Sequence, residues 1–97
     1  MTNLDDEASE LRSLARKPAR FLYRRHAEQE LQKDGIPKID VENMLRRCRV
    51  TMVEERGGEL TRRAEGTDIN GRPIVVIVVP DEETGAIKII TGWAAKR

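Results

Sequence analysis

GRPIVVIVVPDEETGAIKIITGW, residues 71–93, is the stretch that decides the fold. Residues 74–79 are six consecutive aliphatics, and residues 86–91 include three isoleucines. Short apolar runs that are rich in β-branched side chains and bounded by turn residues are typical of strands buried on both faces. The run between them ends on Gly85, which adopts a positive φ without steric cost and so favours a reversal. We therefore predict a central β-hairpin whose two faces are covered by the rest of the chain.

Two further strands are predicted before this hairpin, over residues 50–56 and 60–66. The pair Gly57-Gly58 between them is typical of a tight hairpin turn. The pair Asn70-Gly71 predicts a second turn, which leads into the apolar hairpin. Together the four strands make a four-stranded antiparallel β-meander.

The first half of the chain predicts two or three helices. The first covers about residues 1–16, with Thr2 or Asn3 as its cap and Pro18 as its stop. Its apolar stripe is thin, which is compatible with fraying, with docking on a partner, or with an extension outside the core domain. A second helix covers about residues 24–34, after a short link over residues 19–23.

A third helix is predicted after Pro37, because proline is favoured near a helix N-terminus. Its apolar side chains fall at i, i+3, i+4 and i+7 (Val41, Met44, Leu45 and Cys48). We therefore expect an α+β fold in which two or three N-terminal helices pack on one face of the meander. Residues 1–18 form an N-terminal helical lead, and residues 19–97 form the α+β domain.

The net charge of +1 is unevenly distributed along the 97 residues. Residues 11–63 hold 14 Lys and Arg against 8 Asp and Glu, a net charge of +6. A basic middle segment is compatible with a phosphate-binding face, and equally with uneven surface charge. Only three residues are aromatic, which argues against a stacking platform for bases.

Cys48 is the only cysteine, so neither an internal disulfide nor a zinc site made of cysteines is expected. The polar start of the chain is not typical of a signal peptide, and no apolar run approaches the ~20 residues of a membrane span. We expect a cytoplasmic protein without a membrane partner. No metal or cofactor is expected either, because the sequence offers no cluster of metal ligands and no phosphate-binding loop.

Arg63 and Lys88 both alternate away from neighbours that point to the core. Both are therefore expected on the sheet face that the helices leave uncovered. Two cations there form either a solvated surface or the floor of an anion site.

Three segments resemble a bacterial family known only as a domain of unknown function. They are HAEQELQKDGIPKIDVENMLRRCRV (residues 26–50), RRAEGTDINGRPIVVIVV (residues 62–79) and IKIITGW (residues 87–93). The resemblance extends over about residues 21–93, and its specificity lies in the order and spacing of the segments. That family is in turn similar to the RelE/ParE and MqsR-like toxin superfamily of small α+β proteins.

The resemblance implies a RelE-like fold and a metal-independent endoribonuclease of a toxin–antitoxin system, an mRNA interferase. RNA or the ribosome, and a small antitoxin-like protein, are the implied partners. On the family pattern His26 matches the leading histidine, and Arg63 matches the arginine before the glycine-rich turn, with Arg62 as the alternative one register step away. Thr91 matches the threonine of the last strand. Asp34 departs from the pattern, because a basic residue usually precedes that glycine.

RNA cleavage requires a base for the 2′-hydroxyl proton and cations on the phosphate. His26, the only histidine, is the candidate base, and Arg63 the candidate catalytic cation. Arg62, Lys88 and Thr91 are the candidate phosphate-binding residues. His26 is also compatible with a surface position near a helix start. The alternative function is a non-catalytic protein-binding module on the same scaffold: an inactive toxin relative, an inhibitor of another enzyme, or a partner subunit. The near-neutral total charge favours this alternative.

Overall fold

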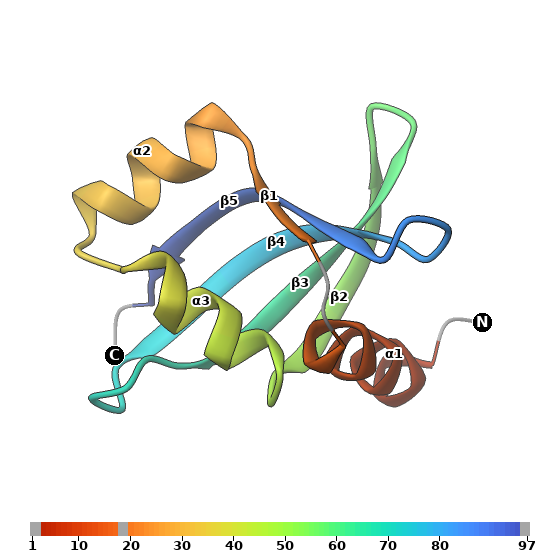
Figure 1. Ribbon diagram of the computed structural model, residues 1–97, viewed down its shortest axis with the longest axis horizontal. Helices are drawn as coiled ribbons and strands as arrows, with labels where there is room; N and C mark the ends of the chain where they lie inside the picture. The colour runs from red at the N-terminus through yellow and green to blue at the C-terminus, as the bar shows by residue number, and fades with distance from the viewer. Residues whose placement is uncertain (1–2, 18–19, 96–97) are drawn as a thin grey trace.

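The computed structural model describes residues 3–17 and 20–95. These residues form three helices and five strands (Figure 1): α1 Leu4–Arg16, β1 Arg20–Tyr23, α2 Arg25–Lys33, α3 Lys38–Leu45, β2 Arg49–Arg56, β3 Glu59–Thr67, β4 Pro73–Asp81 and β5 Ala86–Ala94. None of these helices has the length and apolar composition that crossing a membrane requires.

The five strands form one mixed sheet in the order β1-β5-β4-β3-β2. Strand β1 runs parallel to β5, and the other three pairs are antiparallel. The predicted four-stranded antiparallel meander is therefore wrong. The link over residues 19–23 contains β1, which also separates α1 from α2, so the helices do not all precede the strands. Four residues are too few to display a strand period, and the pairing partner lies near the other end of the chain.

Strand β4 lies at the centre of the sheet and is buried on both faces, as its apolar run predicted. Helices α1 and α3 lie across one face, and α2 runs beside β5 (Figure 1). The opposite face, which we call the uncovered face, has no helix across it in the described part of the chain. Val75 and Ile77 of β4 point to it, yet they are only 2% and 5% exposed. Long side chains of the neighbouring strands therefore cover them.

The core between the helices and the sheet contains leucines and other large apolar side chains from every layer. Its largest fully buried members on the helices are Leu11, Leu31, Val41, Met44 and Leu45, and on the sheet Ile74, Val76, Val78, Ile87 and Ile89. Cys48 belongs to this core, and burial raises the pKa of its thiol to about 11, so it is a poor nucleophile at neutral pH.

Helix α1 begins with a side-chain cap and packs into the core. The Asn3 Oδ1 accepts hydrogen bonds from the backbone N–H groups of Asp5 (2.9 Å) and Asp6 (3.2 Å). Its inward side chains Ala8, Leu11 and Ala15 are buried. Thr2 and Pro18, which the sequence suggested as cap and stop of this helix, lie outside the described residues.

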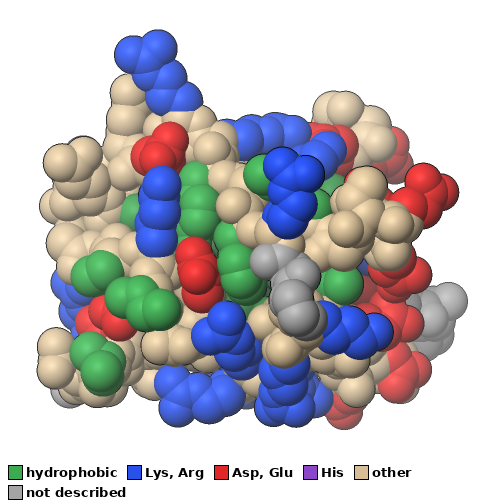
Figure 2. All heavy atoms as spheres, in the orientation of Figure 1, with side chains coloured by type: hydrophobic (Ala, Val, Ile, Leu, Met, Phe, Trp, Pro, Cys, Tyr) green, Lys and Arg blue, Asp and Glu red, His purple; other side chains and the backbone are tan. Residues whose placement is uncertain are grey.

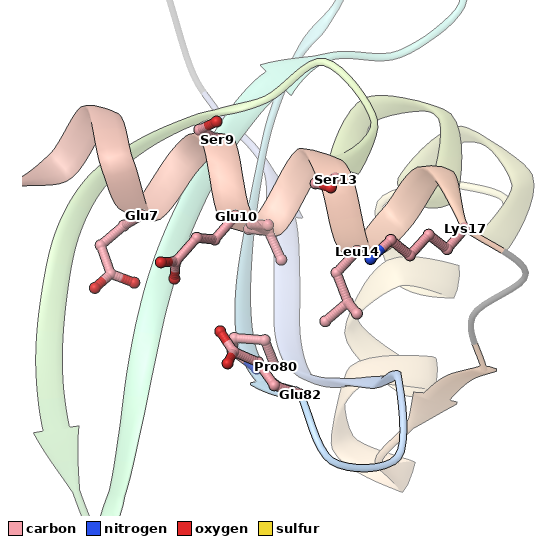
Figure 3. A pocket seen from close by; sticks show the side chains of 9 residues that line it. Glu7, Ser9, Glu10, Ser13, Leu14, Lys17, Pro80 and Glu82 are labelled. Atoms are coloured by element: carbon pink, nitrogen blue, oxygen red, sulfur yellow. The ribbon is translucent and has the colours of Figure 1, made fainter.

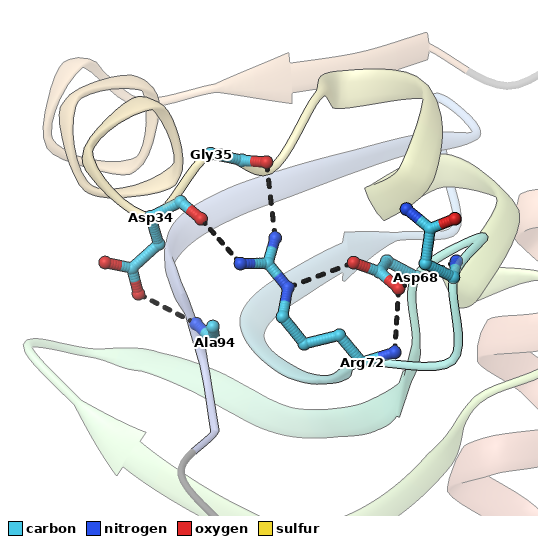
Figure 4. Close-up of polar contacts among 6 residues, drawn as sticks. Asp34, Gly35, Asp68, Arg72 and Ala94 are labelled. Carbon is cyan, nitrogen blue, oxygen red and sulfur yellow. Dashed lines mark hydrogen bonds and ion pairs between the residues drawn. The ribbon is translucent and has the colours of Figure 1, made fainter.

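The end of α2 is fixed to β5 and to the turn after β3 (Figure 4). The Asp34 carboxylate accepts a hydrogen bond from the Ala94 N–H at 2.8 Å. The Arg72 guanidinium donates to the carbonyls of Asp34 (2.9 Å) and Gly35 (3.2 Å), which directly follow the helix. It also pairs with the Asp68 carboxylate at 3.0 Å. Asp34, which departs from the family pattern in sequence, thus holds α2 against the sheet.

Asp68 shapes the turn between β3 and β4. Its carboxylate accepts the backbone N–H groups of Arg72 (2.8 Å) and Asn70 (2.9 Å). These hydrogen bonds, led by the one from the Arg72 N–H, lower the pKa of Asp68. Gly71 takes the positive φ that the turn requires.

Removing the Asp34 carboxylate tests this attachment. We expect Asp34→Ala to lower the free energy of unfolding by about 1–3 kcal/mol, because the Ala94 N–H loses its acceptor. Asp34→Asn keeps an oxygen that accepts and is the matched control, with a smaller loss. Urea denaturation measures both, and equal losses in the two variants would contradict the role of the hydrogen bond.

Gly66 of β3 lets α3 approach the sheet closely. A Cβ added there would lie 2.5 Å from the Cγ of Met44, a buried side chain of α3. We expect Gly66→Ala to destabilise the protein by about 1–3 kcal/mol through overpacking. In a Met44→Ala background the same change should cost much less, because the obstructing atoms are gone. A double-mutant cycle by urea denaturation measures this, and additive losses would contradict it.

Candidate functional site

The uncovered face carries a small hollow of about 70 Å³ around Arg63. In sheet register Met52, Arg63, Ile77 and Thr91 form one row across β2, β3, β4 and β5. The hollow is lined by Met52, Glu54, Arg56, Thr61, Arg63, Ile77, Thr91 and Trp93. The structure therefore brings together Arg63 and Thr91, two of the site residues predicted from the sequence.

Arg63 is held between a carboxylate and an indole ring. Its Nε pairs with the Glu65 carboxylate at 3.1 Å, and its guanidinium carbon lies 5.7 Å from the centre of the Trp93 ring. The pKa of Glu65 is lowered, first by the hydrogen bond from the Thr51 hydroxyl and then by the nearby charges of Arg63 and Arg49. Arg63 is thus oriented, but its charge is partly compensated.

Lys88 lies on the same face as Arg63, next to a different carboxylate. Its neighbours in sequence, Ile87 and Ile89, are fully buried on the helix side, so alternation turns Lys88 to the uncovered face. The Lys88 Nζ lies 3.5 Å from the Glu59 carboxylate, which Arg24 also contacts at 2.6 Å. These contacts, led by the Arg24 hydrogen bond, lower the pKa of Glu59. Lys88 does not line the hollow.

Arg62 lies on the other side of the sheet. It is adjacent to Arg63 in β3, and its Nε pairs with the Glu7 carboxylate of α1 at 2.9 Å. Both side chains are largely covered, at 15% and 19% exposure. The structure therefore does not bring Arg62 to Arg63, and its place under α1 indicates a structural role.

His26 is exposed in the first turn of α2. Glu28 on this helix pairs with Lys38 at the start of α3, at 2.7 Å. Two residues along a helix correspond to a rotation of about 200°, so His26 points away from α3. The helix-side view in Figure 2 shows no histidine. Leu31 of α2 packs against Gly92 and Val76 on the helix side of the sheet, and His26 does not line the hollow around Arg63. The structure therefore does not bring His26 together with Arg63 and Thr91.

Sequence reasoning missed Trp93 as a site residue. Trp93 lies next to Thr91 on the same side of β5, lines the hollow and contacts the Arg63 guanidinium. The alternation of Thr91 and Trp93 along the last strand was the signal that could have found it.

A larger hollow, of about 390 Å³, lies between α1 and the turn after β4 (Figure 3). Glu7, Glu10 and Glu82 line it, together with Lys17. Its carboxylates outnumber its cations, which makes it a poorer candidate for binding phosphate than the hollow around Arg63. Across residues 3–17 and 20–95, no three His, Cys, Asp or Glu side chains gather where they would hold a metal ion.

A family model described as "Domain of unknown function (DUF4258)" matches residues 23–92, well over half of the chain, and the chain belongs to this family. No curated protein matches the chain. The matched region runs from the last residue of β1 into β5, so it includes His26, Arg63 and Thr91. Helix α1 and Trp93 lie outside it. The family's description assigns no activity.

Trp93 is the only tryptophan, so its fluorescence reports directly on the hollow. We expect Arg63→Ala to shift the Trp93 emission to longer wavelength, because the indole loses the guanidinium that covers it. Lys88→Ala, which removes the same charge from the same face without touching the hollow, is the control and should leave the emission unchanged. Equal shifts in the two variants would contradict the contact between Arg63 and Trp93.

Proposed function

We propose that this protein binds RNA over the uncovered face and cleaves it without a metal ion, as a toxin-like endoribonuclease. The observation that carries the proposal is the hollow on the uncovered face in which Arg63, Thr91 and Trp93 meet. The resemblance of the sequence motifs to RelE/ParE and MqsR-like toxins, which the family match itself does not extend to, favours the same reaction class.

In this mechanism the neutral imidazole of His26 accepts the proton of the RNA 2′-hydroxyl. The 2′-oxygen attacks phosphorus and the bond to the 5′-oxygen breaks, which leaves a 2′,3′-cyclic phosphate and a 5′-hydroxyl that takes its proton from water. Arg63 stabilises the charge that develops on the phosphate, and the Thr91 hydroxyl donates a hydrogen bond to it. Trp93 offers a ring on which a flanking base stacks.

The pairing of Arg63 with Glu65 does not prevent this role. The two side chains are 39% and 27% exposed. The pair engages the Nε of Arg63, and the two terminal nitrogens of the guanidinium donate parallel hydrogen bonds to a phosphate. A bound phosphate therefore does not have to displace Glu65.

A second candidate function is a non-catalytic binding module whose partner is a small antitoxin-like protein. The observation in its favour is that Arg62, Arg63 and Lys88 each contact a carboxylate of this chain. Cations whose charge is compensated in this way stabilise the sheet, and this role requires no substrate.

Cleavage of an end-labelled RNA by the purified protein, with EDTA present and with and without ribosomes, separates the two functions. We expect His26→Ala and Arg63→Ala each to lower the cleavage rate by about 10²–10⁴-fold. Gln29→Ala on α2 and Arg20→Ala on β1 change exposed residues without removing a catalytic group, and they should retain activity.

RNA that stays intact under both conditions, with a protein that unfolds cooperatively on heating, would contradict the nuclease and favour the binding module. Cleavage that EDTA abolishes would contradict the metal-independent mechanism.

A further inference from the structure

Five arginines gather where α1 and α3 end and β2 begins. They are Arg12, Arg16, Arg46, Arg47 and Arg49, which we call the arginine cluster. Figure 2 shows Lys and Arg side chains collected along the lower edge of the molecule, below α1 and α3. The cluster lies within the basic middle segment of the sequence and does not belong to the hollow around Arg63.

Backbone carbonyls orient three of these guanidinium groups. Arg12 donates to the Cys48 carbonyl at 2.8 Å. Arg16 donates to the Arg46 carbonyl at 3.1 Å, and Arg46 donates in turn to the Ala15 carbonyl at 3.1 Å. Carbonyls at the ends of helices attract cations, so these contacts fix the side chains. A carbonyl carries no net charge, and each guanidinium therefore keeps its full positive charge.

The cluster lacks the carboxylate partners that the other cations have. None of the ion pairs formed within residues 3–17 and 20–95 includes a member of the cluster. Glu65 acts on Arg49 at longer range, but it is already bound by Thr51 and Arg63. Asp40 lines a shallow hollow with Arg46 and Arg47 and is itself 8% exposed. A concentrated positive surface remains.

This surface continues onto the uncovered face through Arg49. In sheet register Arg49 is opposite Glu65, and across the next two strands Val75 and Trp93 follow in the same row. A polyanion bound to the cluster thus turns around the end of the sheet to reach Trp93 and Arg63. A single nucleic-acid strand makes such a turn readily, whereas a duplex has a persistence length of about 50 nm and does not bend around a molecule only 32 Å long.

We propose that the arginine cluster binds the phosphodiester backbone of a single nucleic-acid strand and delivers it to the hollow around Arg63. Only the identification of this strand as RNA rests on the proposed function. Arginine suits this role because its planar fork donates two hydrogen bonds to one phosphate and its charge is permanent.

The test measures binding of a fluorescein-labelled 2′-O-methyl oligouridine of about 12 nucleotides, within the length range of single-strand sites. This probe has no free 2′-hydroxyl, so its binding is independent of cleavage. Arg47→Gln with Arg49→Gln is the test variant, because both side chains are exposed and neither holds another element in place. Arg20→Gln with Lys33→Gln removes the same charge from two exposed side chains elsewhere and is the control.

We expect the test variant to bind roughly tenfold more weakly. The slope of log Kd against log salt should fall by about 1.4, because each of the two lost phosphate contacts contributes ~0.7 to it. The control should keep the slope and affinity of the unmodified protein. Oligodeoxythymidine should bind comparably, because the contacts are to phosphate, and an oligoglutamate of equal charge should compete poorly.

Equal weakening in the two double variants would overturn the proposal, since net charge alone would then explain binding. Effective competition by oligoglutamate would also overturn it and assign the surface to an acidic protein. A parallel cleavage assay keeps the two proposals apart. If binding depends on the arginine cluster but no RNA is cleaved, the result supports this surface and contradicts the nuclease. If RNA is cleaved but binding does not depend on the cluster, the result supports the nuclease and contradicts this surface.

Discussion

The outer edge of β5 is the constraint on which the rest of the structure depends. Strand β1 pairs with its first half, over Ala86 to Ile89, and the Arg24 N–H then donates to the Ile89 carbonyl at 3.0 Å. Beyond that point the chain enters α2, whose Leu31 packs over Gly92 of β5, and the Asp34 carboxylate accepts the Ala94 N–H. The first half of this edge is thus paired with a strand, and its far end is held by a side chain. Because these contacts hold both ends of α2, they also fix which of its side chains face the core.

Two kinds of positive charge follow from this architecture. Arg63 and Lys88 lie on the uncovered face, where carboxylates of the same sheet compensate them. The arginine cluster lies at the helix ends, where carbonyl oxygens orient the side chains without neutralising them. The first kind suits a site that positions one phosphate, and the second suits a surface that attracts a polyanion. The two surfaces meet along the row of Arg49 and Trp93.

Local patterns predicted most of the fold and part of the site. The apolar run placed β4 at the centre, Gly57-Gly58 gave the turn between β2 and β3, and alternation turned Arg63 and Lys88 to one face. β1 was missed because four residues show no period and its partner is remote in sequence. The burial of Arg62 depends on Glu7, and the role of Asp34 depends on Ala94, contacts between residues far apart that no local pattern encodes.

We propose that His26 and the hollow around Arg63 contribute to one RNA-binding surface. Titration of a 2′-O-methyl dinucleotide, followed by NMR at the His26 imidazole and the Trp93 indole N–H, tests it most directly. We expect both signals to shift and to saturate with one dissociation constant, and Arg63→Ala to weaken both shifts together. A dinucleotide that moves the Trp93 signal while the His26 signal stays still would contradict it.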